Sequence, residues 1–156
     1  MPGESLQCRA MEDIDAAILR ALQADGRASF ADLARVTGLS TSAVHQRVKR
    51  LEQRRVIVSY TTVVDAEAAG LALTAFVAVK PIDPAAPDDT AERLLRLAAI
   101  EACHSIAGQE SYLLKVRVAS PGDLERLLAE IRATANVSTV TTIVLSTPYE
   151  GRPLPL

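Results

Sequence analysis

The sequence predicts an α+β protein built from two units, a bundle of three helices followed by a β-α-β-β-α-β unit. Between Asp13 and Leu51 the apolar residues recur at helical spacing. From Leu73 onward, short β-branched runs alternate with helical patterns. Of the 156 residues, 49% are hydrophobic and 23% are charged, which excludes a disordered protein and leaves enough apolar side chains for two cores.

Three helices are predicted in the first unit, each bounded by a start or stop signal. Asp25-Gly26 ends the first helix, Ser29 with Asp32 starts the second in an approximate capping box, and Ser40 caps the third after the turn Thr37-Gly38-Leu39. The first helix is expected to bury Ile14, Ile18 and Leu22, and the third Val44, Val48 and Leu51.

The spacing between the second and third helices is typical of a helix-turn-helix. Ala34 permits close contact between the helices, Gly38 supplies the turn, and Val44 fixes the second helix of the pair onto the first. This geometry projects the later helix into a DNA major groove. The alternative for residues 13–60 is a small helical module that binds another protein.

Charge and polarity on the third helix favour a nucleic acid over that alternative. Residues 1–60 carry nine Lys or Arg against seven Asp or Glu, whereas residues 61–156 carry eight against twelve. The outer face of the helix presents short polar side chains toward its start and cations toward its end, with Glu52 as its only acid. A solvated helix would more often intersperse acids for pairing.

Two short β-branched runs, 56–60 and 61–65, follow the third helix and predict the wing of a winged helix. Behind them we expect a strand over 73–80, a helix over 90–100, strands over 102–107 and 112–118, a helix over 123–133 and a strand over 137–146. This order predicts a ferredoxin-like sandwich with both helices on one sheet face. Self-association of two such sheets would bury the other face.

Several function classes are excluded by composition. Aromatic residues make up 3% of the chain, too few for platforms that stack bases. Two cysteines and two histidines match no metal spacing, so we expect no metal and no cofactor. No apolar stretch reaches the length of a membrane span, and the start lacks the apolar core of a signal peptide, so a cytoplasmic protein is expected. No acid, base and nucleophile converge around His104, and we expect no enzyme.

Across residues 12–147 the sequence resembles the Lrp/AsnC, or feast/famine, family of transcriptional regulators. The matching text includes Asp13-Ile14-Asp15, 22–27, Gly38-Leu39-Ser40, Leu51-Glu52 and the stretch 108–112. The resemblance implies a winged helix-turn-helix that reads double-stranded DNA, joined to a domain that binds an effector and assembles dimers into octamers. It also implies an amino acid as the usual effector.

The resemblance assigns DNA contacts to the start and outer face of the third helix. The candidate residues are Ser40, Thr41, Ser42, His45, Gln46, Arg47, Lys49 and Arg50. Ser42, His45 and Gln46 should reach base edges, while Arg47, Lys49 and Arg50 should hold phosphates or brace the helix. Arg47 lies at the margin of the buried stripe, so it either contacts phosphate or braces the helix.

The resemblance places the effector between dimers, around a glycine turn and the last strand. The candidates are Ser105, Ala107, Gly108, Gln109, Glu110, Ser111, Ile143, Val144 and Leu145. Backbone N–H groups at the turn would hold a carboxylate, and an acid would hold the ammonium group. Ser111 replaces the aspartate of the family, and Glu110 beside it would face the other way in a strand. These residues could instead only pack the oligomer.

The sequence thus predicts a tail at 1–11, a DNA-binding domain at 12–60, a wing strand and linker at 61–72, an effector and oligomerisation domain at 73–147, and a tail at 148–156. The leading hypothesis is a sequence-specific transcriptional regulator modulated by an amino acid. The alternatives are a DNA-organising protein of the same fold without an effector, and a dimeric α+β enzyme. Arg55 occupies a position where the family commonly has glycine, and a left-handed backbone there would cost on the order of 1 kcal/mol.

Overall fold

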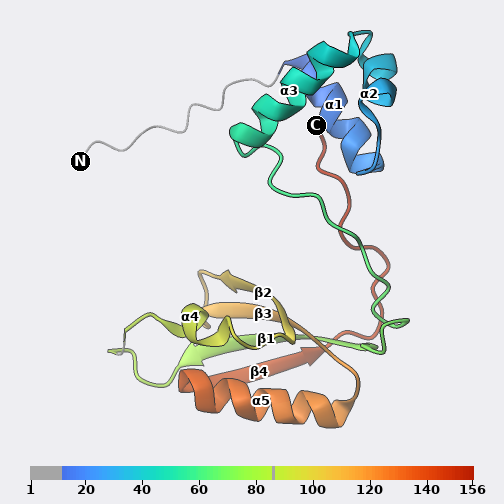
Figure 1. Ribbon diagram of the computed structural model, residues 1–156. Helices are drawn as coiled ribbons and strands as arrows, with labels where there is room; N and C mark the ends of the chain where they lie inside the picture. Colours follow the sequence, from blue (N-terminus) through green and yellow to red (C-terminus); the bar gives the residue numbers. More distant parts are fainter. Residues whose placement is uncertain (1–11, 86) are drawn as a thin grey trace, which may run out of the picture. The chain divides into compact units, whose positions relative to one another are not determined.

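The computed structural model describes residues 12–85 and 87–156, which form two compact units (Figure 1). The first unit contains the chain up to Val63 together with Tyr149–Leu156, and the second contains Val64–Pro148. Of the C-terminal tail predicted at 148–156, Tyr149–Leu156 is therefore part of the first unit and Pro148 is part of the second. The predicted tail at 1–11 lies outside the described residues.

The first unit has the three expected helices, α1 (Asp13–Ala24), α2 (Phe30–Thr37) and α3 (Thr41–Gln53). The side chain of Ser29 accepts a hydrogen bond from the backbone of Asp32, whose carboxylate accepts one in return, so the capping box is confirmed. Gly38 ends α2 with a φ of 71°, a left-handed conformation that glycine adopts without steric cost. Six buried aliphatic side chains form the core: Ile18, Leu19, Leu33, Val44, Val48 and Leu51.

The predicted wing does not form as strands. Residues 56–65 have no regular secondary structure in the described chain. The two β-branched runs follow each other without a glycine or asparagine turn between them, so they cannot fold back as a hairpin. Arg55 has a φ of 55°, so the left-handed conformation considered for it is confirmed.

The second unit follows the expected β-α-β-β-α-β order. Its elements are β1 (Leu73–Pro81), α4 (Thr90–Leu94), β2 (Ile100–Ser105), β3 (Tyr112–Val118), α5 (Pro121–Ala135) and β4 (Val137–Ile143). The helix predicted over 90–100 ends at Leu94. Tight turns follow it, so that Leu97 joins Leu94 in the core, and β2 starts at Ile100.

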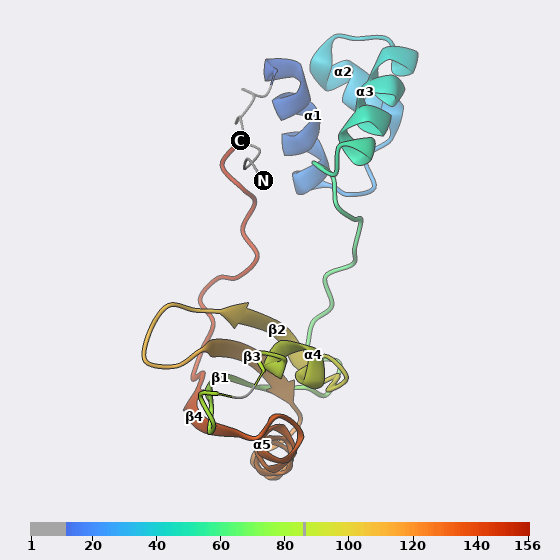
Figure 2. The ribbon, with the colours of Figure 1, turned by 90° about the vertical axis from the view of Figure 1, so that its left-hand side faces the viewer.

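The four strands form an antiparallel sheet in the order β2-β3-β1-β4, with α4 and α5 beside it (Figure 2). Ala75, Val77 and Val79 alternate into one core together with Leu94 of α4 and Leu127 of α5. Since alternate residues of a strand point to the same face, both helices cover one face of the sheet. Among the described residues of the second unit, no helix or strand covers the opposite face.

In the part of the chain that the structure describes, no helix is both long and apolar enough to cross a membrane.

Candidate nucleic-acid interface and effector site

The outer face of α3 carries most of the residues predicted to contact DNA. Val44, Val48 and Leu51 anchor the opposite face in the core. The exposed residues of α3 include Thr41, Ser42, His45, Gln46, Lys49 and Arg50, and Glu52 and Gln53 at its end are exposed as well. Within residues 12–85 and 87–156, neither Lys49 nor Arg50 forms a salt bridge, so both charges face solvent without a carboxylate partner.

Ser40 has a structural task at the start of this face. Its hydroxyl accepts a hydrogen bond from the backbone N–H of Ala43 at 3.3 Å, and so caps α3. It also lies 3.1 Å from the hydroxyl of Ser42. If Ser40 contacts DNA, it must therefore use a hydroxyl oxygen that already accepts the hydrogen bond from Ala43.

His45 is held from one side by an aromatic ring that sequence reasoning did not single out. The ring of Phe30, at the start of α2, lies 5.0 Å from the imidazole between centroids, in an edge-to-face arrangement with an interplanar angle of 79°. Such pairs add about 0.5–1.5 kcal/mol beyond area burial. The contact limits the directions in which His45 points.

Arg47 turns inward and joins α3 to α1. Its guanidinium donates hydrogen bonds to the carboxylates of Glu12 and Asp15, each at 2.8 Å. The side chain of Arg47 is 24% exposed and that of Asp15 is 9% exposed. The hydrogen bonds to Glu12 and then Asp15 raise the pKa of Arg47, and the same contact lowers the pKa of Glu12. Of the two roles open from the sequence, this geometry favours bracing.

The segment after α3 is tied back to that helix. The hydroxyl of Tyr60 donates to a carboxylate oxygen of Glu52 at 3.0 Å. Partial burial, followed by this hydrogen bond, raises the pKa of Tyr60. The only acid on α3 is therefore engaged by the chain itself.

In the second unit, a cavity of about 460 Å³ lies at the end of the sheet where β2 turns into β3. Five of the predicted effector residues line it: Ser105, Ala107, Gly108, Glu110 and Ser111. Glu110 and Ser111 both line this cavity, and residues 107–111 form a bend, so the strand alternation expected for this pair is absent. The structure adds Lys80, Asp83, Asp88 and Tyr112 to the lining, which sequence reasoning missed.

Tyr112 joins the loop after β1 to the floor of this cavity. The Tyr112 hydroxyl donates a hydrogen bond to a carboxylate oxygen of Asp88. That bond, together with burial, raises the pKa of Tyr112 to about 12. The signal in the sequence was a loop rich in aspartate, but nothing in the spacing showed which aspartate would meet the tyrosine.

The remaining effector candidates lie elsewhere in the chain. Ile143 pairs with Ala75 near one end of β1, whereas Tyr112 pairs with Val79 near the other. Val144 donates to the carbonyl of Thr74, and Leu145 is almost fully exposed. Gln109 is exposed and does not line the cavity. One chain therefore assembles the turn side of the predicted site but not its last-strand side.

No group of three or more His, Cys, Asp or Glu side chains that could hold a metal ion occurs among the described residues. Every buried side-chain nitrogen or oxygen in the same residues has a hydrogen-bond partner.

Two family models match the chain. An AsnC-type helix-turn-helix domain matches residues 11–52, and an Lrp/AsnC ligand binding domain matches residues 74–154. The chain belongs to the Lrp/AsnC family. Its helix-turn-helix and its α+β unit are thus the two domains of a family of transcriptional regulators, as the resemblance implied.

Relatives that are named as transcriptional regulators match this chain over nearly its whole length. The HTH-type transcriptional regulator LrpA of Mycobacterium tuberculosis is 52% identical over 143 residues, which is 92% of this chain and 95% of that protein. The HTH-type transcriptional regulator FL11 of Pyrococcus horikoshii is 31% identical over 147 residues, covering 94% and 97% of the two chains.

Solved structures extend the similarity to the fold. The leucine response regulatory protein LrpA of M. tuberculosis superposes with a TM-score of 0.83 at 50% identity, covering 91% of this chain and 97% of that one. A feast or famine regulatory protein from M. tuberculosis, complexed with L-methionine, superposes with a TM-score of 0.90 at 52% identity, covering 92% and 97%. The bound amino acid belongs to that relative.

Replacing Arg47 tests its bracing role. Arg47→Ala leaves the Asp15 carboxylate buried without a partner, and we expect a loss of about 2 kcal/mol in the free energy of unfolding. Adding Asp15→Asn to this variant should restore part of the loss, because the uncompensated charge is gone. Chemical denaturation of the two single variants and the double variant measures the coupling. Strictly additive losses would contradict the bracing role, and Lys49→Ala is the control that should leave stability unchanged.

Proposed function

We propose that this family member reads specific DNA sequences through α3, responds to an amino acid bound at the β2–β3 turn, and carries out no enzymatic reaction. The observation that carries the DNA-binding part is the exposed face of α3, where hydrogen-bonding side chains precede two cations without partners among the described residues. Such a face matches what a major groove requires, with base edges near the start of the helix and phosphates beside its end. The proposed site of action is the cytoplasm.

Base contacts and phosphate contacts fall to different residues. Gln46 can bond adenine with both ends of its amide, and Ser42 and His45 lie on the same exposed face. Lys49 and Arg50 carry positive charge at the later part of the helix, where it attracts phosphate irrespective of sequence. Arg47 is assigned to bracing.

Two single substitutions separate these roles. Gln46→Ala should cost about 1–3 kcal/mol on the preferred site and little on unrelated DNA, so it relaxes specificity. Lys49→Ala should weaken both by a similar factor and reduce the slope of affinity against salt by about one. Fluorescence anisotropy titrations with specific and scrambled duplexes at three salt concentrations measure both quantities. Unchanged binding in both variants would contradict the assignment of α3. Equal affinity of the unaltered protein for all duplexes would favour a DNA-organising protein instead.

The effector part of the proposal is supported by the groups that line the β2–β3 cavity. Among the hydrogen bonds found within the described residues, none is donated by the backbone N–H groups of residues 107–110, which suits them to an anionic carboxylate. Glu110 is half-buried beside them and provides a negative charge for an ammonium group. Since Ser111 carries no charge, Glu110 takes the role that the family gives to the next residue.

Gly108 provides a test of this site that does not disturb the fold. A Cβ built on Gly108 meets no atom within 4 Å, and its φ is not positive, so a larger residue fits the isolated chain. Gly108→Leu should therefore leave the melting temperature unchanged but block whatever approaches the turn.

We expect one or more of the twenty amino acids to stabilise the unaltered protein, by about 2.7 kcal/mol at a concentration 100 times its Kd. Thermal melting measures this shift. It should vanish in Gly108→Leu and persist in Glu125→Leu, which adds the same side chain on the exposed face of α5. A shift that survives Gly108→Leu would place the ligand elsewhere, and no shift with any amino acid would contradict the effector.

Assembly into dimers is proposed through the sheet face that α4 and α5 leave open. The strand register places Leu113, Ala78 and Val140 in one row across β3, β1 and β4, with Phe76 in the next row. Val140 is 60% exposed and Phe76 is 38% exposed. An apolar row of this kind on a sheet is covered most economically by the same face of a second copy. Such dimers would then form octamers, as the resemblance implies.

Val140→Asp should weaken the dimer by at least about tenfold, because pairing would bury an unpartnered carboxylate. Light scattering coupled to size exclusion measures the mass over a range of concentrations. Leu95→Asp, which adds the same charge at an exposed leucine just after α4, should not change the mass. A mass unaffected by Val140→Asp would show that the copies meet through another surface.

A further inference from the structure

The last residues of the chain lie against the DNA-binding unit and not against the sheet that precedes them. Residues Tyr149–Leu156 cluster with the three helices, and both ribbon views place the end of the chain beside α1 (Figures 1 and 2). The ligand binding domain model, in contrast, continues to residue 154. Most of this segment is therefore ligand-domain sequence that packs on the helices of the other domain.

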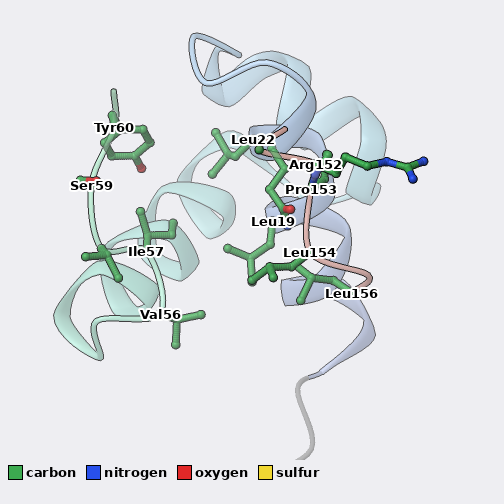
Figure 3. A pocket seen from close by; sticks show the side chains of 13 residues that line it. Leu19, Leu22, Val56, Ile57, Ser59, Tyr60, Arg152, Pro153, Leu154 and Leu156 are labelled. Carbon is green, nitrogen blue, oxygen red and sulfur yellow. The ribbon is translucent and has the colours of Figure 1, made fainter. Parts of the chain in front are cut away.

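The segment forms part of the wall of an apolar groove. The groove holds a cavity of about 580 Å³, with α1 and the segment on one side and residues 56–60 on the other (Figure 3). From α1 the lining includes Leu19 and Leu22, and from the segment Leu154 and Leu156, which lie close to Leu19 in the view. Ile57 and Tyr60 face them across the cavity. Leucine side chains thus line the cavity from both α1 and the segment, and Leu156 is less exposed, at 37%, than Leu154, at 71%.

A polar contact fixes the end of the segment. The guanidinium of Arg20, on α1, donates a hydrogen bond to the backbone carbonyl of Leu156 at 2.9 Å. The segment bends just before this point, where the N–H of Leu156 donates to the carbonyl of Leu154. Near its start, the guanidinium of Arg152 stacks over the ring of Tyr149 at 5.2 Å. The hydrogen bond from Arg20 thus holds the end of the segment, and contacts within the segment set its bend and its start.

The DNA-binding unit benefits from such a cover because it is small. Its core consists of six buried aliphatic residues on three helices, and domains of about 50–60 residues are marginal in stability. Leu19 belongs to that core and also lines the groove, so whatever covers the groove adds to the same core.

We propose that Gly151–Leu156 is a strap of the DNA-binding unit: it closes the α1 side of the groove and holds α1 in its folded position. Because Arg47 joins α1 to α3, the strap also supports the helix to which we assign the DNA contacts. Two connections consequently join the second unit to the DNA-binding unit, the linker after α3 and the strap. A change in the second unit that pulls on the strap would loosen α1.

Hydrogen exchange of the 156-residue chain tests this proposal without requiring DNA or an effector. In a chain that stops at Glu150, the backbone amides of residues 19–24 should exchange about tenfold faster than in the full chain, since α1 loses both the hydrogen bond from Arg20 and the apolar cover of the segment. Amides of β1, β3 and α5 should be unchanged. The result does not depend on whether the assigned DNA contacts are correct, so failure of either proposal can be told apart.

Two point variants disturb the same contacts without shortening the chain, and a third variant is the control. Leu156→Asp should reproduce most of the acceleration, and Arg20→Ala, which removes the polar anchor, should give a smaller one. Val36→Asp changes an exposed apolar residue of α2 outside the groove and should leave α1 protected. Unaltered exchange on α1 in the shortened chain would overturn the strap. So would protection that rises with protein concentration irrespective of the strap, because a second copy would then be the occupant of the groove.

Discussion

The pairing of Arg47 with Asp15 is the interaction on which the DNA-binding unit depends. A carboxylate as buried as that of Asp15 is unfavourable unless a cation and hydrogen bonds compensate it, and Arg47 supplies both at 2.8 Å. The pair crosses from α1 to α3, so it fixes the direction in which the outer face of α3 points. It also turns one cation of α3 inward, which leaves Lys49 and Arg50 as the exposed cations on the later part of that helix.

A comparable constraint acts in the second unit. Strict alternation along β1 and β3 sends one set of side chains into the core with α4 and α5 and leaves the other set on an uncovered face. Tyr112 belongs to the inward set, yet its hydroxyl reaches Asp88 at the rim of the cavity. The same strand therefore supports the sheet, positions the loop after β1 and lines the cavity where we place the effector.

Local signals in the sequence were sufficient to predict most of the fold. The capping box of Ser29 and Asp32, the glycine turn at Gly38 and the alternation from Tyr112 to Val118 each depend on neighbouring residues, and each is found in the structure. The wing was wrong because β-branched residues favour extended backbone but cannot pair without a turn. The helix after Thr90 was too long because its pattern fits a helix and a pair of tight turns equally well.

The features that were not predicted join residues far apart in the chain. Glu12 and Asp15 meet Arg47 across more than 30 positions, and Arg20 meets Leu156 across 136. The candidate effector site divides in the same way: its turn residues share a cavity within one chain, whereas Ile143–Leu145 lie toward the other end of the sheet. Sequence patterns report neighbours along a helix or strand, but these pairs are chosen by tertiary packing.

An effector changes DNA binding only if it binds two states of the protein with different affinity. The turn at Gly108 and the strap belong to different units, but the chain between β4 and the strap is short and covalent. A rearrangement that displaces the end of β4 would act on α1 through the strap and on α3 through the linker. A small domain with six core residues responds to the loss of a few apolar contacts more strongly than a large one would. The small core of the DNA-binding unit would thus be what makes it controllable from the other unit.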